Sequence, residues 1–452
     1  MPKSLTDMLR NVLDYDDFTS NTIERTKWVI LDSLAAVLQS VSSESPIINF
    51  IKDVSKETPS TESCIPILGT NTFTTKINSA IIHGTAMVSN ELDEGNQFAK
   101  GHPAAHILPA AYLSAIVNRS SGEDFIKAFI LGYETSSRLA YATNMKDYMH
   151  PHGTWGNVGG AVAASILANK SKEDIIETAL LAATLPIATT WQAAEKGVSA
   201  RNLYTGIGSY LAYEALDLQS YGFRSSLSVV EDLWSHIMSN GFQHSRLFDE
   251  LLTPPLIEKN YFKLYPSCRF THSALDALQA ILQESDLEPT DIEKIEVYTY
   301  SLASRCKTQQ PKTPLEAKFS IPFMLATMLK GIDLYQINNE SVLFDPSLLV
   351  LASKICVYED KNLTSLLPEQ RPARVVINLH NGKEHSATVF SAIGEHDQPF
   401  NENELLEKYN KMLNPFYSKQ QISQLVTFTF ALETYADFNY WLKDLTSGLG
   451  GK

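Results

Sequence analysis

The chain has 452 residues, of which 44% are hydrophobic and 10% aromatic, and its formal net charge is −14. A chain of this length exceeds the size at which one hydrophobic core usually stops growing, so we expect two packed domains. The acidic balance, without any run of lysine and arginine, argues against nucleic acid or an anionic membrane as a partner, because both are bound by basic surfaces. No stretch is long and apolar enough to predict a membrane span.

The cysteines and the N-terminal segment indicate in which cellular compartment the protein works. The four cysteines lie far apart and form no Cys-x-x-Cys pair, which predicts reduced thiols in a reducing compartment. The first residues carry Asp7 and Arg10 among apolar ones and lack the hydrophobic core of a signal peptide. We therefore expect a cytoplasmic protein, with a mitochondrial address left open.

The first half of the chain has a helical pattern. Apolar residues recur at helical spacing over residues 23–38, and similar patterns continue to about Leu252. Residues 159–164 and 179–183 are rich in small side chains. Because small residues let helix backbones approach closely, these segments predict helices that are buried on all sides.

The pattern changes after Thr253. Alternating residues predict a strand over 292–300, and segments 373–379 and 384–390 flank an Asn-Gly turn that favours a two-stranded hairpin. Helical spacing returns in residues 402–412 and 422–432. The simplest architecture is a large helical domain interrupted by a smaller α+β domain, with a cleft between them for a small molecule.

The first dense group of polar residues lies in segment 90–106. This segment is broken by glycine and proline, and its polar residues include Asp93, Glu94, Asn96, His102 and His106. Polar groups on such a loop are typical of a functional site. The alternative is that the acidic residues cap the helix that begins near Pro103.

The second group is His150, His152 and Trp155, directly before the small-residue helix. A histidine before a helix N-terminus feels the positive end of the helix dipole, which favours a neutral, proton-accepting ring. The alternatives are a pair that binds zinc or copper, or simply two surface histidines.

The third and fourth groups bring cations to turns that lead into helices. Arg201 follows Lys196, and segment 263–272 contains Lys263, Tyr265, Arg269 and His272. Cations near a helix start suit a carboxylate ligand. The alternative for each is a solvated surface charge.

Several common motifs are absent from the sequence. There is no phosphate-binding P-loop, no dinucleotide-binding glycine motif after a strand, no nucleophile elbow and no His-Glu-x-x-His. A metal site would have to combine Asp93 and His102 with His106 or His152, at a spacing that is not specific for any metal.

Taken together and in this order, these segments resemble the MmgE/PrpD family, which includes 2-methylcitrate dehydratases, cis-aconitate decarboxylases and iminodisuccinate epimerases. The resemblance spans nearly the whole chain. The residues that carry it are Glu91 to Gly95, Gly101 to Pro103, His150 with Gly156, Gly206, Lys263 to Pro266 with His272, and Ala317 to Phe323. The chain departs from many members in having Arg201 in place of a lysine and Phe323 in place of a tyrosine.

The resemblance implies a mainly α fold, with a large all-helical domain formed by both chain ends and an inserted, smaller α+β lid domain. The corresponding domain bounds are 1–260, 261–397 and 398–452. It also implies a homodimer that needs no cofactor and no metal. Its acid/base residues carry over to Asp93, His102 and His150, and its substrate-anchoring lysine to Lys263.

The expected function is a cofactor-independent lyase that acts on a small di- or tricarboxylic acid, with a 2-methylcitrate dehydratase-like hydro-lyase favoured. The alternatives are a cis-aconitate decarboxylase-like enzyme, an iminodisuccinate epimerase-like enzyme, and a noncatalytic carboxylate-binding protein. Dehydration, decarboxylation and epimerisation all make or quench a carbanion next to a carboxylate. Each therefore requires a near-neutral base and cations that stabilise the spreading charge.

We expect His102 and His150 to transfer protons and Asp93 to orient one imidazole. Arg201, Lys263 and Arg269 would bind substrate carboxylates. The further substrate-binding candidates are Asn96, His152, Trp155, Tyr265 and His272. The histidines expected to be structural or on the surface are His83, His236, His244, His380, His385 and His396.

Overall fold

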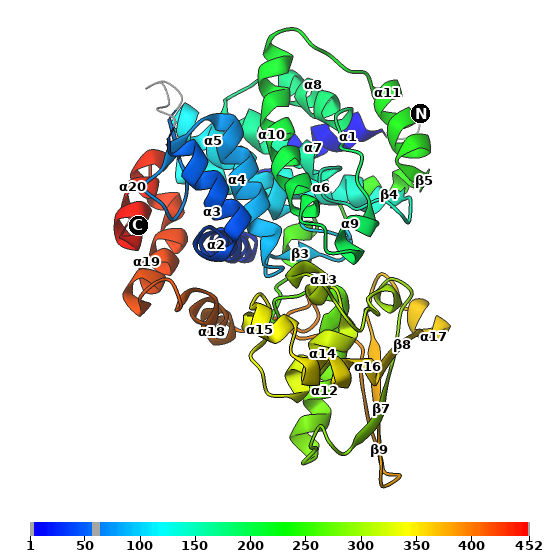
Figure 1. Ribbon diagram of the computed structural model, residues 1–452. Coiled ribbons are helices and arrows are strands. Elements are labelled where there is room, and N and C mark those ends of the chain that lie inside the picture. Colours follow the sequence, from blue (N-terminus) through cyan, green and yellow to red (C-terminus); the bar gives the residue numbers. More distant parts are fainter. Residues whose placement is uncertain (1–3, 57–63, 451–452) are drawn as a thin grey trace. The chain divides into compact units, whose positions relative to one another are not determined.

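The computed structural model describes residues 4–56 and 64–450. Its chain is mainly α-helical, which confirms the predicted fold class, and it divides into two compact units (Figure 1). Unit 1 holds the described residues up to Thr190, Arg201–Asn260 and those from Asn403 onward, and unit 2 holds Trp191–Ala200 and Tyr261–Glu402. The short segment Trp191–Ala200 thus belongs to unit 2 although unit 1 contains the chain on both sides of it.

The domain bounds expected from the sequence, 1–260, 261–397 and 398–452, stay predictions. Residues 1–3, 57–63 and 451–452, which fall within those bounds, lie outside the described residues. No described helix combines the length and the apolar character needed to cross a membrane. All four cysteines are among the described residues and are free thiols, as the sequence predicts.

Unit 1 is built from helices of both chain ends and a few very short strands. Its helices are α1 (Leu5–Leu13), α2 (Ser20–Ser43), α3 (Ser45–Val54), α4 (Lys76–Ser89), α5 (Ala104–Asn118), α6 (Gly122–Ala142), α7 (Gly156–Leu167), α8 (Lys172–Ala183), α10 (Ala200–Ser220), α11 (Leu227–Asp232), α18 (Glu402–Leu413), α19 (Lys419–Phe430) and α20 (Phe438–Leu449). Its strands are β1 (Ile65–Pro66), β2 (Phe73–Thr74), β3 (Gly95–Asn96), β4 (Thr143–Met145) and β5 (Ser239–Phe242), and β6 (Asn260–Tyr261) lies at the boundary of the units. Helices of the two ends meet where α19 packs against α2.

The helix α7 lies at the centre of unit 1 and packs against α5, α6 and α8. Its small residues allow this, because a Cβ atom added at Gly159 would stand 2.1 Å from the carbonyl oxygen of Gly132 in α6. The close packing predicted for this segment is therefore present. It fixes the N-terminus of α7, just after the His150 segment.

The neighbouring helix α5 contains a proline in its interior. Pro109 has no N–H group for the carbonyl of Ala105, four residues earlier. The hydroxyl of Ser209 in α10 donates to that carbonyl instead, at 3.3 Å. The Ser209 hydroxyl thus replaces the missing backbone donor, so the buried carbonyl keeps a hydrogen bond. The same bond connects α10 to α5.

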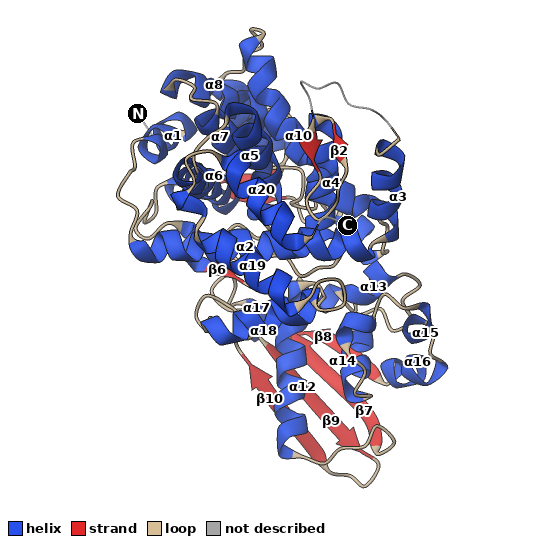
Figure 2. Ribbon diagram, turned by 90° about the vertical axis from the view of Figure 1, so that its left-hand side faces the viewer, coloured by secondary structure: helices blue, strands red, loops and turns tan. Residues whose placement is uncertain are grey.

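Unit 2 combines a four-stranded sheet with short helices. The elements are α9 (Trp191–Glu195), α12 (His272–Glu284), α13 (Pro314–Lys318), α14 (Ile321–Leu329), α15 (Glu340–Leu343), α16 (Pro346–Ser353), α17 (Lys361–Thr364), β7 (Ile292–Thr299), β8 (Ile355–Glu359), β9 (Ala373–Leu379) and β10 (Glu384–Val389). The strand order is β10-β9-β7-β8, and only the β7–β8 pair is parallel. The helix α12 packs against β9 and β10, as Figure 2 shows.

The hairpin of β9 and β10 has nearly the bounds that the sequence predicts. Gly382 in its turn has φ +79°, a conformation that glycine adopts without strain. The strand β8 was not predicted. Its residues show no alternation of buried and exposed positions, and its partner β7 lies more than fifty residues earlier in the chain.

The segment Trp191–Ala200 is fastened within unit 2 by several contacts. Ala194 lies in an apolar cluster with Cys268, Leu315 and Phe319. The hydroxyl of Thr313 donates to the carbonyl of Gly197 at 3.1 Å. Short as it is, this segment contributes to the core of unit 2.

Candidate active site

The first candidate residues lie on the loop between α4 and α5. The carboxylate of Asp93 is buried, and its Oδ2 lies 3.0 Å from Nδ1 of His102. The same Nδ1 is 2.6 Å from the carbonyl oxygen of Glu94. A carbonyl oxygen can only accept, so Nδ1 carries the hydrogen, and a neutral His102 has Nε2 as its basic nitrogen.

Glu94, the neighbour of Asp93, caps a helix. Its Oε1 accepts the N–H of Ala104 at the start of α5, and its Oε2 accepts the hydroxyl of Tyr133, both at 2.9 Å. Burial, followed by the nearby charges of Asp93 and Asp32, raises the pKa of Glu94 to about 8. The sequence left two roles open for the acidic residues of this segment, a functional site and a helix cap. Glu94 is the helix cap, and its neighbour Asp93 contacts the candidate site residue His102.

Asn96 has its side chain bound to the backbone. Its Oδ1 accepts the N–H groups of Phe98 and Ala99 at 2.9 and 3.1 Å, and its Nδ2 donates to the carbonyl of Leu256 at 2.8 Å. These contacts hold the loop that leads to His102. The substrate-binding role expected for Asn96 stays a prediction.

His150 lies before α7 and faces two donors. Its Nδ1 accepts the N–H of His152 at 3.2 Å, and its Nε2 faces the Nε–H of Arg201 at 3.3 Å. A protonated imidazole has no acceptor nitrogen, so both neighbours favour the neutral ring. Burial, and then the charge of Arg201, lower the pKa of His150 well below its usual value.

His152 adjoins both proton-transfer candidates. Its ring centre lies 5.2 Å from that of His102 and 4.5 Å from that of His150. Its Nδ1 is 2.9 Å from the hydroxyl of Thr205, and its buried Nε2 has no hydrogen-bond partner within the described part of the chain. Burial, followed by the charge of Arg201, lowers the pKa of His152 well below its usual value.

His106 and Trp155 pack beneath these histidines. Nε2 of His106 accepts the N–H of Gly153 at 2.8 Å, while its Nδ1 lies 3.2 Å from the carbonyl of His102. Burial lowers the pKa of His106 to about 4. The ring of Trp155 is fully buried, 6.0 Å from that of His106. His106 therefore joins the two histidine segments as a neutral, structural residue.

Arg201 lies buried at the start of α10 and pairs with a carboxylate. Its Nη1 is 2.5 Å from Oε1 of Glu91 and 3.3 Å from the carbonyl of Val88. Glu91 has φ +55°, a conformation that costs energy for a residue with a side chain. Sequence reasoning quoted Glu91 in the first segment but did not predict it as the partner of Arg201.

Unit 2 gathers the remaining candidates. Nη1 of Arg269 is 2.9 Å from Nδ1 of His272, and its Nε donates to Oε1 of Glu395 at 2.8 Å. The hydroxyl of Tyr265 donates to Asp276 at 2.7 Å, and burial raises the pKa of Tyr265. Lys263 is fully buried, which argues against its alternative as a solvated surface charge.

Sequence reasoning missed Glu395 and Asp276, the acidic partners in unit 2. Glu395 follows a glycine and precedes a histidine, and Asp276 is one of several polar residues in α12. Neither position has a spacing that points to Arg269 or Tyr265. Only the fold of unit 2 shows these pairings.

The structure thus brings the candidates together in two groups. In unit 1, Asp93, His102, His150, His152 and Arg201 form a continuous chain of contacts. In unit 2, Tyr265, Arg269 and His272 do the same. Across residues 4–56 and 64–450, no three His, Cys, Asp or Glu side chains are arranged as metal ligands.

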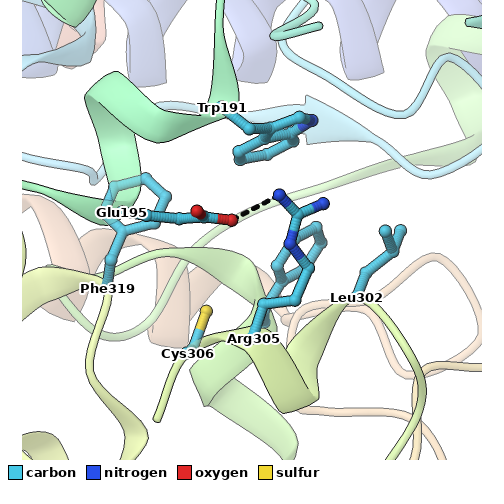
Figure 3. Close-up of a pocket in the computed structure, with 7 residues that line it drawn as sticks. Trp191, Glu195, Leu302, Arg305, Cys306 and Phe319 are labelled. Atoms are coloured by element: carbon cyan, nitrogen blue, oxygen red, sulfur yellow. Dashed lines mark ion pairs between the residues drawn. The ribbon is translucent and has the colours of Figure 1, made fainter. Parts of the chain in front are cut away.

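A pocket in unit 2 lies apart from these residues. It has a volume of about 230 Å³, counted to its open mouth, and Figure 3 shows its aromatic lining and the ion pair between Glu195 and Arg305. None of the predicted site residues lines it.

Models of known families match most of the chain. The MmgE/PrpD N-terminal domain matches residues 4–246, and the MmgE/PrpD C-terminal domain matches residues 265–429. The chain belongs to the MmgE/PrpD family. This confirms the resemblance seen in the sequence.

Characterised relatives of this MmgE/PrpD chain are distant but align over nearly the full length. The chain is 22% identical to a cis-aconitate decarboxylase of Aspergillus terreus (strain NIH 2624 / FGSC A1156), covering 93% of this chain and 91% of the relative. A cis-aconitate decarboxylase-like protein, oryM, of Aspergillus oryzae (strain ATCC 42149 / RIB 40) is also 22% identical, over 93% of this chain and 92% of the relative.

Proposed function

We propose that this chain is a lyase that acts on a small di- or tricarboxylic acid by proton transfer at a carbon next to a carboxylate, without a metal or organic cofactor. The observation that carries the proposal is the pair of acceptors at Nδ1 of His102, the Glu94 carbonyl and the Asp93 carboxylate, because they leave Nε2 as a basic nitrogen on an oriented ring. Membership of the MmgE/PrpD family supports the same reaction class.

The proposed roles divide between bases and cations. His102 takes or gives the proton at Nε2, with Asp93 stabilising the imidazolium that forms. His150 is the second proton-transfer group, and its neutral ring suits a base. Arg201, Lys263 and Arg269 are the cations that bind substrate carboxylates. A fixed cation beside a carboxylate also stabilises the charge that spreads into it when the adjacent proton leaves.

The first candidate reaction is dehydration of a 2-methylcitrate-like acid. In this reaction a base removes the proton next to a carboxylate, the C–O bond on the adjacent carbon breaks, and an acid protonates the leaving hydroxide to give water. The histidines supply one base and, once protonated, one acid, so no redox partner is needed.

Decarboxylation is the second candidate, and the full-length similarity to proteins named as cis-aconitate decarboxylases favours it. Here a C–C bond breaks to release CO₂, and the carbanion that remains is protonated by a histidine. The same residues serve both reactions, because both pass through charge on the carbon next to a carboxylate.

Proton NMR in deuterated water separates these reactions. The protein is first dialysed against EDTA and then incubated with citrate, 2-methylcitrate, cis-aconitate and tartrate-like acids. Dehydration converts a hydroxy acid into an unsaturated acid without release of CO₂, decarboxylation releases CO₂ and leaves deuterium at the protonated carbon, and epimerisation produces only exchange with inversion. Binding of an acid without exchange or turnover would contradict the proposal and favour a carboxylate-binding protein. Activity that disappears with EDTA and returns with a divalent metal would refute metal independence.

A further inference from the structure

A buried ion pair supports the loop that carries Asp93. Lys408 in α18 forms an ion pair with Asp32 in α2, and both side chains are completely buried. The same ammonium group donates to the carbonyl oxygen of Leu92 at 3.1 Å. Leu92 directly precedes Asp93, so the charged hydrogen bond fixes the peptide plane from which the Asp93 residue extends.

Folding stability does not account for this pair. Removing two charges from water costs several kcal/mol per ion, roughly, and replacing a buried pair by apolar residues of similar volume is often neutral or stabilising. The position of the Leu92 carbonyl is the feature that an apolar replacement could not reproduce.

The loop is held from its other side as well. Glu91, one residue before Leu92, pairs with Arg201. The carbonyl of Glu94, two residues after Leu92, accepts Nδ1–H of His102. The Leu92 carbonyl therefore lies between two contacts of the candidate site, and a shift there changes the approach of Asp93 to His102.

We propose that Lys408, held by Asp32, is a positioning residue that sets the Asp93 carboxylate against Nδ1 of His102. The inference rests on the proposed function for its kinetic consequence, but the geometry that it assigns does not depend on which acid is the substrate. Lys408 touches no substrate atom. It acts through the Leu92 peptide and then through Asp93.

The chain provides a matched control for this pair. Lys27, which lies in α2 like Asp32, forms an ion pair with the exposed Glu433 and donates to the carbonyl of Phe430 at 2.9 Å. It thus repeats the arrangement of a lysine, a carboxylate and a backbone carbonyl, joining α2 to the C-terminal region. Phe430 is not a neighbour of any candidate site residue in the sequence.

The test compares two neutral double variants, Asp32→Leu with Lys408→Met and Lys27→Met with Glu433→Gln. We expect both to keep a Tm within about 5 °C of the wild type, since apolar replacement of a buried pair is often tolerated and a pair with an exposed partner contributes little. We expect kcat to fall at least about tenfold in the first variant, with KM changed less than about threefold, and to stay near wild type in the second. The single variant Lys408→Arg, which keeps the charge and Asp32, should show a smaller loss of kcat than the first double variant.

A second measurement needs no substrate. The proton on Nδ1 of His102 should give a far-downfield NMR signal in the wild type and in the control variant, and this signal should broaden or vanish in the Asp32→Leu, Lys408→Met variant. If that signal changes while no acid on the panel is turned over, the positioning role stands and the proposed function fails. An unchanged signal, unchanged kcat, or a loss of stability far beyond the control would overturn the positioning role.

Discussion

Adjacent carboxylates in this protein have different chemical tasks. Asp93 faces an imidazole, while Glu94 accepts the first N–H of a helix and a tyrosine hydroxyl. The sequence presents both as members of one acidic motif. The difference arises because successive side chains of the loop point to different neighbours, a geometry that no residue type encodes.

The raised pKa of Glu94 has a consequence for stability. Between about pH 4.5 and pH 8 the folded protein keeps a proton on Glu94 that the unfolded chain releases, so this group makes the fold less stable as the pH rises. Glu94→Gln mimics the protonated form and should melt higher than the wild type at pH 8, with a smaller difference at pH 5. The exposed Glu407→Gln is the control. A difference from wild type that does not grow with pH would contradict the raised pKa.

The proton-transfer candidates provide a second prediction at this scale. His102→Gln and His150→Gln should each lower kcat by about 10²-fold or more, the usual size of a general acid/base contribution. His380→Gln, in the exposed β9–β10 turn, should leave kcat unchanged. Circular dichroism checks that each variant is folded. Turnover near wild type in either of the first two variants would remove that histidine from the mechanism.

Much of the candidate site could be predicted at the residue scale, and the reason is local. Asp93 and His102 lie nine positions apart in one loop, and His150 and His152 precede one helix, so their grouping is visible in the sequence. The contact between His150 and Arg201 joins separate segments, and the sequence indicated both residues as candidates without pairing them. The pairing of Arg269 with Glu395 joins residues that lie more than a hundred positions apart, and nothing in the sequence indicates it.

Among the elements, the tightest packing is that of α7 on α6. A Cβ atom at Gly159 would come within 1.9 Å of the Ser136 hydroxyl oxygen as well as close to the Gly132 carbonyl. Gly159→Ala should therefore destabilise the fold by about 1–3 kcal/mol, the usual cost of overpacking a core. Urea unfolding measures this change.

Gly448→Ala in α20 is the matched control for Gly159→Ala. Both glycines are helical, but the nearest atom to an added Cβ at Gly448 is the end of the Phe428 ring. That ring can move, and alanine has the higher helix propensity, so this variant should be neutral or slightly stabilising. Equal losses in the two variants would contradict the packing argument.

Secondary-structure elements with a strong internal pattern were the ones that the sequence predicted. The Asn-Gly turn places β9 and β10, and the apolar spacing predicts α2. The strand β8 lacks such a pattern because its stability comes from parallel pairing with β7, a distant segment. Its position depends on the whole of unit 2.

On the scale of the whole molecule, buried histidines determine the response to acid. Burial lowers the pKa of His83 to about 3 and of His106 to about 4, and lowers those of His150 and His152 well below the usual value. Below about pH 6.5 the unfolded chain binds protons at these four positions that the folded protein does not bind, so stability falls as the pH falls. Glu94 has the opposite sign in the same range.

Four histidines against one glutamate make the unfolded chain bind more protons than the folded protein near pH 5.5. The free energy of unfolding should therefore fall as the pH is lowered from 6 to 5. Urea titrations at pH 5.0, 5.5 and 6.0 measure this change. A free energy of unfolding that does not fall as the pH is lowered over this range would contradict the lowered pKa values of these histidines.

Because unit 2 includes the separate segment Trp191–Ala200, we expect that residues 261–402 cannot fold alone as a stable domain. A fragment of residues 261–402 would lack Ala194 from its apolar cluster and would leave Arg305 without Glu195. We expect such a fragment to bind a hydrophobic dye and to self-associate, and a peptide of residues 191–200, supplied in trans or fused to it, to suppress both. A fragment that is monomeric and well folded without the peptide would contradict this. Recombination that exchanges unit 2 between relatives would therefore have to carry two separate stretches of gene at once.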